Sequence, residues 1–282
     1  MNTHHPQQVQ QTPQTRQRPS RSIRQRHLAE TLAHPARTRI LRFLCEHRYA
    51  TTKQLARLAA DDYTSPRSAL RQTSRHLTAL SEAGMVTHLE RRVGGWQGGS
   101  TQSIWALTTT GHHTLTRTRA SRQRPHLVST TFLDHLLAIS EVRVTVEETT
   151  RSLPGAQCAV QTEPLCWRTH LGPHGQQVTL RPDLALTVTT PEFEDRYFLE
   201  VDRATENPAR VITTCQRYQH YRHTGMEQSH GGVFPAVIWI VPTHTRARQL
   251  TTAIQADPRI DRPLFTVTTL SDLPDLIRNG PP

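Results

Sequence analysis

Two strand-like runs followed by a helix, between Thr179 and Tyr221, constrain the fold of this chain most strongly. The first run reads TLRPDLALTVTT and the second reads RYFLEV, and both alternate between apolar residues and others. A strand points alternate residues to opposite faces, so each run predicts a strand with one apolar face. The short turn at 191–195 makes the two runs a predicted hairpin. On the first strand the predicted apolar face consists of Leu180, Leu184, Leu186 and Val188.

Three acidic residues fall at one end of this predicted hairpin. Asp183 lies near the start of the first strand, and Glu200 and Asp202 lie at the end of the second. Carboxylate oxygens suit a hard divalent cation, so the pattern predicts a Mg²⁺ or Mn²⁺ site held by Asp183 and Glu200. All three acids are candidate catalytic residues. The alternative is that Pro182-Asp183 is a turn dipeptide and that the acids are solvated strand ends.

This pattern resembles the core of the PD-(D/E)xK nucleases, in which Pro-Asp begins one strand and acid-x-Lys lies on the next. Pro182-Asp183 and Glu200 match that core, and Asp202 stands at the lysine position. Lys53 is the only lysine of the chain and lies far upstream. An arginine cannot replace the lysine as a base because its guanidinium stays protonated. The resemblance therefore implies a nuclease-like domain that lacks one catalytic group.

A longer phrase resembles the replication-relaxation family, which is associated with plasmids and other mobile elements. The phrase is RPD, then FLEVDRATEN, then a helix that carries a tyrosine. The usual form of that family is a winged helix followed by a nuclease-like part, and its pattern often carries Glu-x-Asp-Arg here. The resemblance covers most of the chain after the N-terminal tail. It also makes Glu163, at a strand end, and Glu141, on the preceding helix, candidate acids of the site.

The order of the C-terminal elements agrees with this resemblance. A helical pattern at 126–153 precedes a strand, the hairpin, a helix from Pro208 and the apolar run VFPAVIWIVPT. A continuous apolar run is typical of a strand covered on both faces. The predicted fold is α/β, with a restriction-endonuclease-like α-β-β-β-α-β domain over 126–282.

The N-terminal part predicts a winged helix-turn-helix. Residues 1–22 are polar and basic and predict a disordered tail, because they cannot bury enough apolar surface to order. At 23–110, three helical patterns precede two strand-like runs joined by VGGWQGGS, which is the order of a winged helix. Thr51 with Gln54 predicts a capping box, and Ser65 with Pro66 predicts the start of the third helix. Residues 111–125 are polar and predict a linker.

The third helix supplies the candidate DNA-binding residues. Leu70, Leu77 and Leu80 are predicted to face inward. A recognition helix needs polar and basic side chains for base edges and phosphates, and those that lie off the leucine stripe are of this kind. The alternatives are a solvated basic face or a winged helix that contacts only proteins. The candidates are Arg67, Arg71, Gln72, Ser74, Arg75 and His76 on the helix, and Arg91, Arg92 and Trp96 on the wing.

Composition supports nucleic acid as the partner and excludes other classes. The chain has 34 Lys and Arg against 23 Asp and Glu, and such a basic balance favours nucleic acid or another anionic surface. Arginine predominance suits bidentate contacts, although codon bias explains the shortage of lysine equally well. The four cysteines form no C-x-x-C pair, which argues against a zinc ribbon or a disulfide framework. No apolar run approaches the ~18 residues of a membrane span, so we expect a cytoplasmic protein.

We therefore expect a DNA-binding protein of plasmid or mobile-element replication and relaxation, without efficient nuclease activity. Its expected partners are double-stranded DNA and relaxase or replication proteins. One alternative is a metal-dependent endonuclease or nickase that uses Asp183 and Glu200. A second alternative is a transcriptional regulator that uses only the winged helix. The sequence leaves the oligomeric state open.

Overall fold

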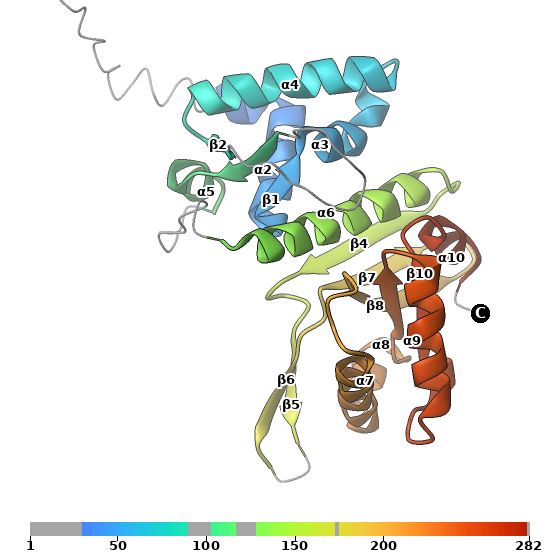
Figure 1. Cartoon of the computed structure of the whole chain (residues 1–282). Coiled ribbons are helices and arrows are strands. Elements are labelled where there is room, and N and C mark those ends of the chain that lie inside the picture. The colour runs from blue at the N-terminus through green and yellow to red at the C-terminus, as the bar shows by residue number, and fades with distance from the viewer. Residues whose placement is uncertain (1–29, 90–102, 117–127, 173–174, 281–282) are drawn as a thin grey trace, which may run out of the picture.

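The computed structural model describes residues 30–89, 103–116, 128–172 and 175–280 (Figure 1). The predicted tail, the wing with Arg91, Arg92 and Trp96, and most of the predicted linker lie outside these residues. The N-terminal part has a three-stranded antiparallel sheet in the order β1-β3-β2. Its elements are α2 (Pro35–His47), β1 (Tyr49–Thr51), α3 (Thr52–Leu58), α4 (Pro66–Glu82), β2 (Val86–Leu89), β3 (Ile104–Leu107) and α5 (Thr109–Thr116).

The predicted helix starts are confirmed. The side chain of Thr51 accepts a hydrogen bond from the Gln54 amide and the Gln54 side chain accepts one from the Thr51 amide, which forms the capping box. Ser65 caps α4, and Pro66 occupies its first turn. The prediction that Leu70 faces inward is wrong, because its side chain is exposed. The buried stripe of α4 consists of Ala69, Thr73, Leu77 and Leu80.

The C-terminal part is built on a five-stranded sheet in the order β10-β9-β8-β7-β4. Strands β8, β9 and β10 run parallel, whereas β7 is antiparallel to both β4 and β8. The predicted order helix-strand-strand-strand-helix-strand corresponds to α6, β4, β7, β8, α7 and β9, with β5 and β6 inserted between β4 and β7 and with α8 inserted before β9. The elements are α6 (Thr130–Arg151), β4 (Gln157–Thr162), β5 (Arg168–Leu171), β6 (Gln177–Leu180), β7 (Leu184–Thr189), β8 (Glu194–Val201), α7 (Pro208–His223), α8 (Met226–Gly231), β9 (Ala236–Val241), α9 (His244–Ala256), β10 (Phe265–Thr269) and α10 (Leu273–Asn279).

A separate hairpin of β5 and β6 interrupts this order and projects away from the main sheet (Figure 1). The alternation over 179–190 predicts one strand, but the structure divides this segment at 181–183 into the end of β6 and the start of β7. As a result, Leu180 packs on the opposite side of the sheet from Leu184. The prediction that the two share an apolar face is wrong for this reason.

Helices cover both faces of the five-stranded sheet. Helices α6 and α10 pack with Leu184 and Leu199 on one face. Helices α7 and α9 pack with Phe198 and Trp239 on the other. Strand β9 is almost entirely buried, as expected for a parallel strand covered on both sides.

Helix α6 lies between the N-terminal helices and the C-terminal sheet (Figure 1). It is buried around most of its circumference, which is typical of a helix surrounded by protein. Its side chains join Tyr49 and Ile104 of the N-terminal sheet to Leu184 and Leu199 of the C-terminal sheet in one apolar cluster. Val144 packs instead in the N-terminal core. The predicted boundary at residue 126 therefore assigns to one part a helix that both parts share.

Candidate functional site

Three acids lie at the ends of adjacent strands at one edge of the C-terminal sheet. Leu184 of β7 pairs with Leu199 of β8 and with Thr162 of β4. One residue further along these registers, Asp183 lies between Glu200 and Glu163. The hairpin register thus brings Asp183 and Glu200 together, as the alternation of the sequence indicated.

The carboxylate of Asp183 is occupied by partners from two elements. Its Oδ2 accepts a hydrogen bond from the Val201 amide at 2.7 Å. Its Oδ1 lies 3.1 Å from Nε2 of His135, which α6 supplies. The hydrogen bond to Asp183 raises the pKa of His135 above its usual value. Asp183 therefore fixes the strand end and holds the imidazole beside it.

Glu200 is half-buried, and its carboxylate has a close hydrogen-bond donor. The hydroxyl of Tyr218, on α7, donates to Oε1 of Glu200 at 2.5 Å. Burial raises the pKa of Glu200 well above its usual range, and the neighbouring charge of Asp183 raises it further. The same burial raises the pKa of Tyr218, so this hydroxyl acts as a donor to the carboxyl group.

Asp202 lines the same cavity as Asp183 and Glu200, but its carboxylate is paired with an arginine. Its side chain is fully buried, and its Oδ2 lies 2.6 Å from Nε of Arg246 on α9. Arg246 also donates to the carbonyl of Glu206 at 2.6 Å. At the position where the nuclease pattern has its lysine, this chain therefore has a buried ion pair.

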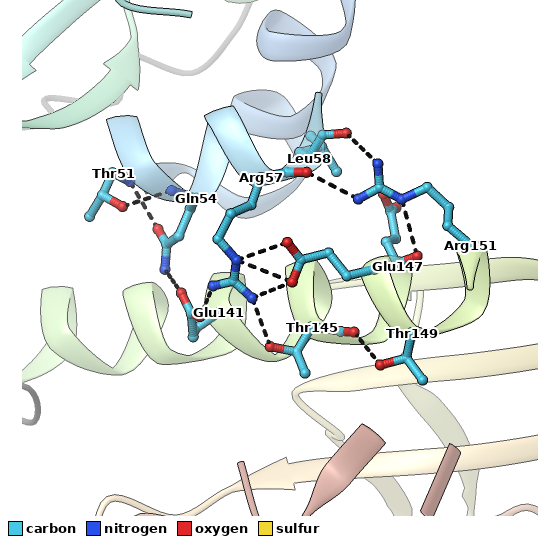
Figure 2. Close-up of polar contacts among 10 residues, drawn as sticks. Thr51, Gln54, Arg57, Leu58, Glu141, Thr145, Glu147, Thr149 and Arg151 are labelled. Atoms are coloured by element: carbon cyan, nitrogen blue, oxygen red, sulfur yellow. Dashed lines mark hydrogen bonds and ion pairs between the residues drawn. The ribbon is translucent and has the colours of Figure 1, made fainter. Parts of the chain in front are cut away.

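The two additional candidate acids are directed toward the N-terminal part. Glu141 forms an ion pair with Arg57 and accepts a hydrogen bond from Gln54 at 3.0 Å, on the side of α6 that faces α3 (Figure 2). Glu163 lies 3.7 Å from Arg48, although its charge still contributes to raising the pKa of Glu200. Glu141 is thus part of the junction between α3 and α6.

The contacts of these acids already use much of the carboxylate oxygen that a divalent cation would require. Across the residues that the structure describes, no group of three or more His, Cys, Asp or Glu side chains is placed to hold a metal ion. Both oxygens of Asp183 and one of Glu200 already accept hydrogen bonds or face an imidazole. Asp202 is neutralised by Arg246.

A cavity of about 750 Å³ opens beside the acids. Three arginines line it together with His135, and they come from separate segments: the β6–β7 connection, the end of β8 and α7. The hairpin strand β6 contributes polar side chains to the same cavity. The lining includes Phe132, His135, Gln177, Thr179, Arg181, Asp183, Glu200, Arg203, Glu206, Thr214 and Arg217.

The second candidate site is the outer face of α4. Arg67, Arg71 and Arg75 are exposed at intervals of four residues and therefore follow one side of the helix. Within the described part of the chain none of the three forms an ion pair. Ser74 is exposed beside them, and its hydroxyl donates to the Leu70 carbonyl.

Two of the predicted DNA-binding residues on α4 are less available. Gln72 and His76 are half-buried. Nε2 of His76 lies 3.2 Å from the Tyr63 hydroxyl, and its ring packs edge-on against His34 at 4.4 Å between centroids. These contacts direct His76 inward, toward the protein.

Three residues of the C-terminal site are not among those that the sequence predicts. His135, Arg217 and Arg246 lie on helices whose apolar residues alone had guided the predictions. The only signal for His135 was its place at the start of the helical pattern, and Arg246 lies 44 positions from Asp202. No local pattern links such distant partners.

Comparison with known proteins places the chain in a family. No curated protein and no solved structure matched it. None of the described helices is long and apolar enough to cross a membrane. A family model described as replication-relaxation matches residues 41–237, which is more than half of the chain. The protein therefore belongs to the replication-relaxation family.

Proposed function

We propose that this protein binds double-stranded DNA through α4 during plasmid or mobile-element replication and relaxation, without cleaving it efficiently. Membership of the replication-relaxation family suggests a role in replication or relaxation. The observation that carries the proposal is the row of exposed arginines Arg67, Arg71 and Arg75 on α4, for which the described residues supply no ion-pair partner. On this proposal the partners are duplex DNA and the proteins that replicate or relax it.

The setting of α4 supports its role as a recognition helix. Helices α2, α3 and α4 precede the antiparallel pair β2 and β3, which is the element order of a winged helix. The buried stripe of α4 faces the N-terminal core, so its arginines point to solvent. Arginine forms bidentate contacts with phosphate oxygens and with guanine, and a helix that presents it fits the major groove.

The second half of the proposal concerns the nuclease-like domain. The order α6, β4, β7, β8, α7 and β9 supports a PD-(D/E)xK-like fold. The carboxylate of Asp202 stands where such a domain has its lysine, and it is bound to Arg246. Asp183 and Glu200 are committed to His135, Val201 and Tyr218. These contacts support a domain that docks DNA and has lost efficient cleavage.

Charge reversal on α4 tests the DNA-binding half. We expect the double variant Arg71→Glu, Arg75→Glu to weaken duplex binding roughly 10- to 100-fold. Loss of two phosphate contacts should reduce the slope of log affinity against log salt by about 1.8. Arg248→Glu is the matched control, because Arg248 is an exposed arginine on α9. Unchanged affinity and slope in the double variant would show that α4 does not bind DNA.

A plasmid-nicking assay tests the alternative of a metal-dependent nuclease. The proximity of Asp183 and Glu200, with Glu163 next to them, is the observation that favours it. Supercoiled plasmid is incubated with Mg²⁺ or Mn²⁺ and with the wild type or Asp183→Ala. Nicking by the wild type that the substitution removes would establish an enzyme. Gel retardation without nicking would support the proposal.

A further inference from the structure

We infer that the C-terminal cavity binds a segment of single-stranded DNA, through its phosphates and one stacked base, without a metal ion. This inference rests on the proposed function in one respect, namely that the protein acts on DNA. It assigns a second DNA-binding site, separate from α4, to the space between β6, α7 and the start of α6. The cavity volume of about 750 Å³ matches a pocket for one or two nucleotides rather than a duplex.

Three arginines give the cavity its capacity to bind phosphate. Arg203 is held in place by Asp134 at 3.1 Å and by the Thr131 carbonyl at 3.2 Å. The guanidinium of Arg181 lies 4.7 Å from the centre of the Trp167 ring. Arg217 is exposed on α7 and forms no ion pair with any residue that the structure describes. Two of the three cations are thus positioned in advance, and the third is free to meet a ligand.

Part of this positive charge is compensated, because Asp134 pairs with Arg203. Arg181 and Arg217 remain as cavity cations without an acidic partner among the described residues. The charge of Asp202 is neutralised by Arg246, and Asp183 faces His135. Glu200 accepts the hydrogen bond of Tyr218. Only the side chain of Glu206, among the described acids that line the cavity, has no hydrogen-bond or ion-pair partner.

An exposed aromatic side chain favours single-stranded over duplex DNA. Phe132 lines the cavity, and 40% of its surface is exposed although it is large and apolar. Proteins that bind single strands combine a basic groove with aromatic side chains on which bases stack. Gln177, Thr179 and Thr214 add hydrogen-bonding groups beside it. A base of a duplex is already stacked and paired, so Phe132 would have no face of a base to contact.

The test measures binding of the full-length chain to a labelled oligothymidylate of about 12 nucleotides, in EDTA, by fluorescence anisotropy. We expect Arg217→Glu to weaken binding roughly tenfold and to reduce its salt dependence. Phe132→Leu should weaken it about fivefold or more, with the salt dependence unchanged. Arg248→Glu should leave it unaltered. Thermal unfolding of each variant checks that it is folded.

A crossed experiment separates this inference from the proposed function. Arg217→Glu should spare duplex binding, and the α4 double variant Arg71→Glu, Arg75→Glu should spare oligothymidylate binding. If Arg217→Glu leaves oligothymidylate affinity unchanged, or if binding requires Mg²⁺, the inference is overturned. It is also overturned if the α4 variant alone abolishes single-strand binding. If the α4 variant binds duplex DNA normally while Arg217→Glu weakens single-strand binding, the inference stands and the proposed role of α4 is wrong.

Discussion

Arginine has opposite roles in two regions of this molecule. Arg246 is paired with Asp202 in the interior. The half-buried Arg57 pairs with Glu141 (Figure 2) and also with Glu148, at the junction of α3 and α6. On the surface, the α4 arginines and Arg217 have no carboxylate partner among the described residues. The first group stabilises the fold and the second is available to ligands. The excess of positive charge in the composition therefore does not by itself separate the arginines that stabilise the fold from those that are available to ligands.

The largest effect on stability is expected from substitution of the buried Arg246. Arg246→Met should lower the free energy of unfolding by about 3–5 kcal/mol, because it leaves Asp202 buried without a counter-charge. Urea unfolding followed by circular dichroism measures the loss. Arg248→Met, on the exposed side of the same helix, should change it by less than about 0.5 kcal/mol. Equal effects of the two substitutions would remove the distinction between interior and surface arginines.

The pH dependence of stability at His47 tests whether the protein interior tolerates a cation that has no acidic partner. The His47 side chain is buried against Phe43, and desolvation lowers its pKa to about 3, with a further contribution from Arg143. When the pH falls below about 6.5, the pKa of histidine in the unfolded chain, His47 binds a proton in the unfolded chain but not in the folded one. The free energy of unfolding therefore falls. This contribution should reach about 2 kcal/mol at pH 5.

The measurement compares the wild type with His47→Phe, which keeps an aromatic ring against Phe43. Between about pH 7 and pH 5 the wild type should lose more stability in urea than the variant. Parallel pH profiles would show that His47 becomes protonated inside the fold, contrary to the rule that interior cations here have acidic partners.

Arg57 should have an intermediate effect, because the junction it forms is only partly buried. Its guanidinium forms an ion pair with Glu148. It also contacts Glu141 and lies 3.4 Å from the Thr145 hydroxyl (Figure 2). We expect Arg57→Met to lower the free energy of unfolding by about 1–2 kcal/mol. A double-mutant cycle with Glu148→Gln should give a coupling energy of about 0.5 kcal/mol or more. Additive effects would mean that the two charges do not stabilise each other.

The smallest effect is expected on ligand affinity, from a substitution at the surface of the cavity. Glu206→Gln removes the one carboxylate of the cavity for which the described residues supply no partner. On the single-strand inference, affinity for oligothymidylate should rise about two- to fivefold at low salt, and the gain should vanish at high salt. Weaker binding in this variant would assign Glu206 a direct contact with the ligand.

The parts of the fold that could be predicted from the sequence depend on neighbours along the chain. The capping box at Thr51 and the cap at Ser65 were predictable because donor and acceptor are three residues apart. The hairpin of β7 and β8 was predictable because alternation fixes the face of every residue. From that register followed the proximity of Asp183 and Glu200.

The parts that escaped prediction depend on contacts between distant segments. The spacing of Leu70 places it on the leucine stripe, but only the packing of α4 shows where the buried face ends. The separation of Leu180 from β7 reflects the β5–β6 hairpin, whose polar composition carries little apolar alternation. Asp202 shares its strand parity with Glu200, and only the position of α9 brings Arg246 to it.

Helix α6 also determines how this protein can be divided. Its side chains fill both the N-terminal core and one face of the C-terminal sheet, so neither part completes its core without it. A cut at the predicted linker would deprive residues 30–116 of the surface on which α3 rests. A functional N-terminal fragment must extend to about Arg151, and the remainder would then lack the helix that covers its sheet. Exchange of halves between related chains therefore requires that the recipient's sheet match the donor's α6, which couples the evolution of the two parts.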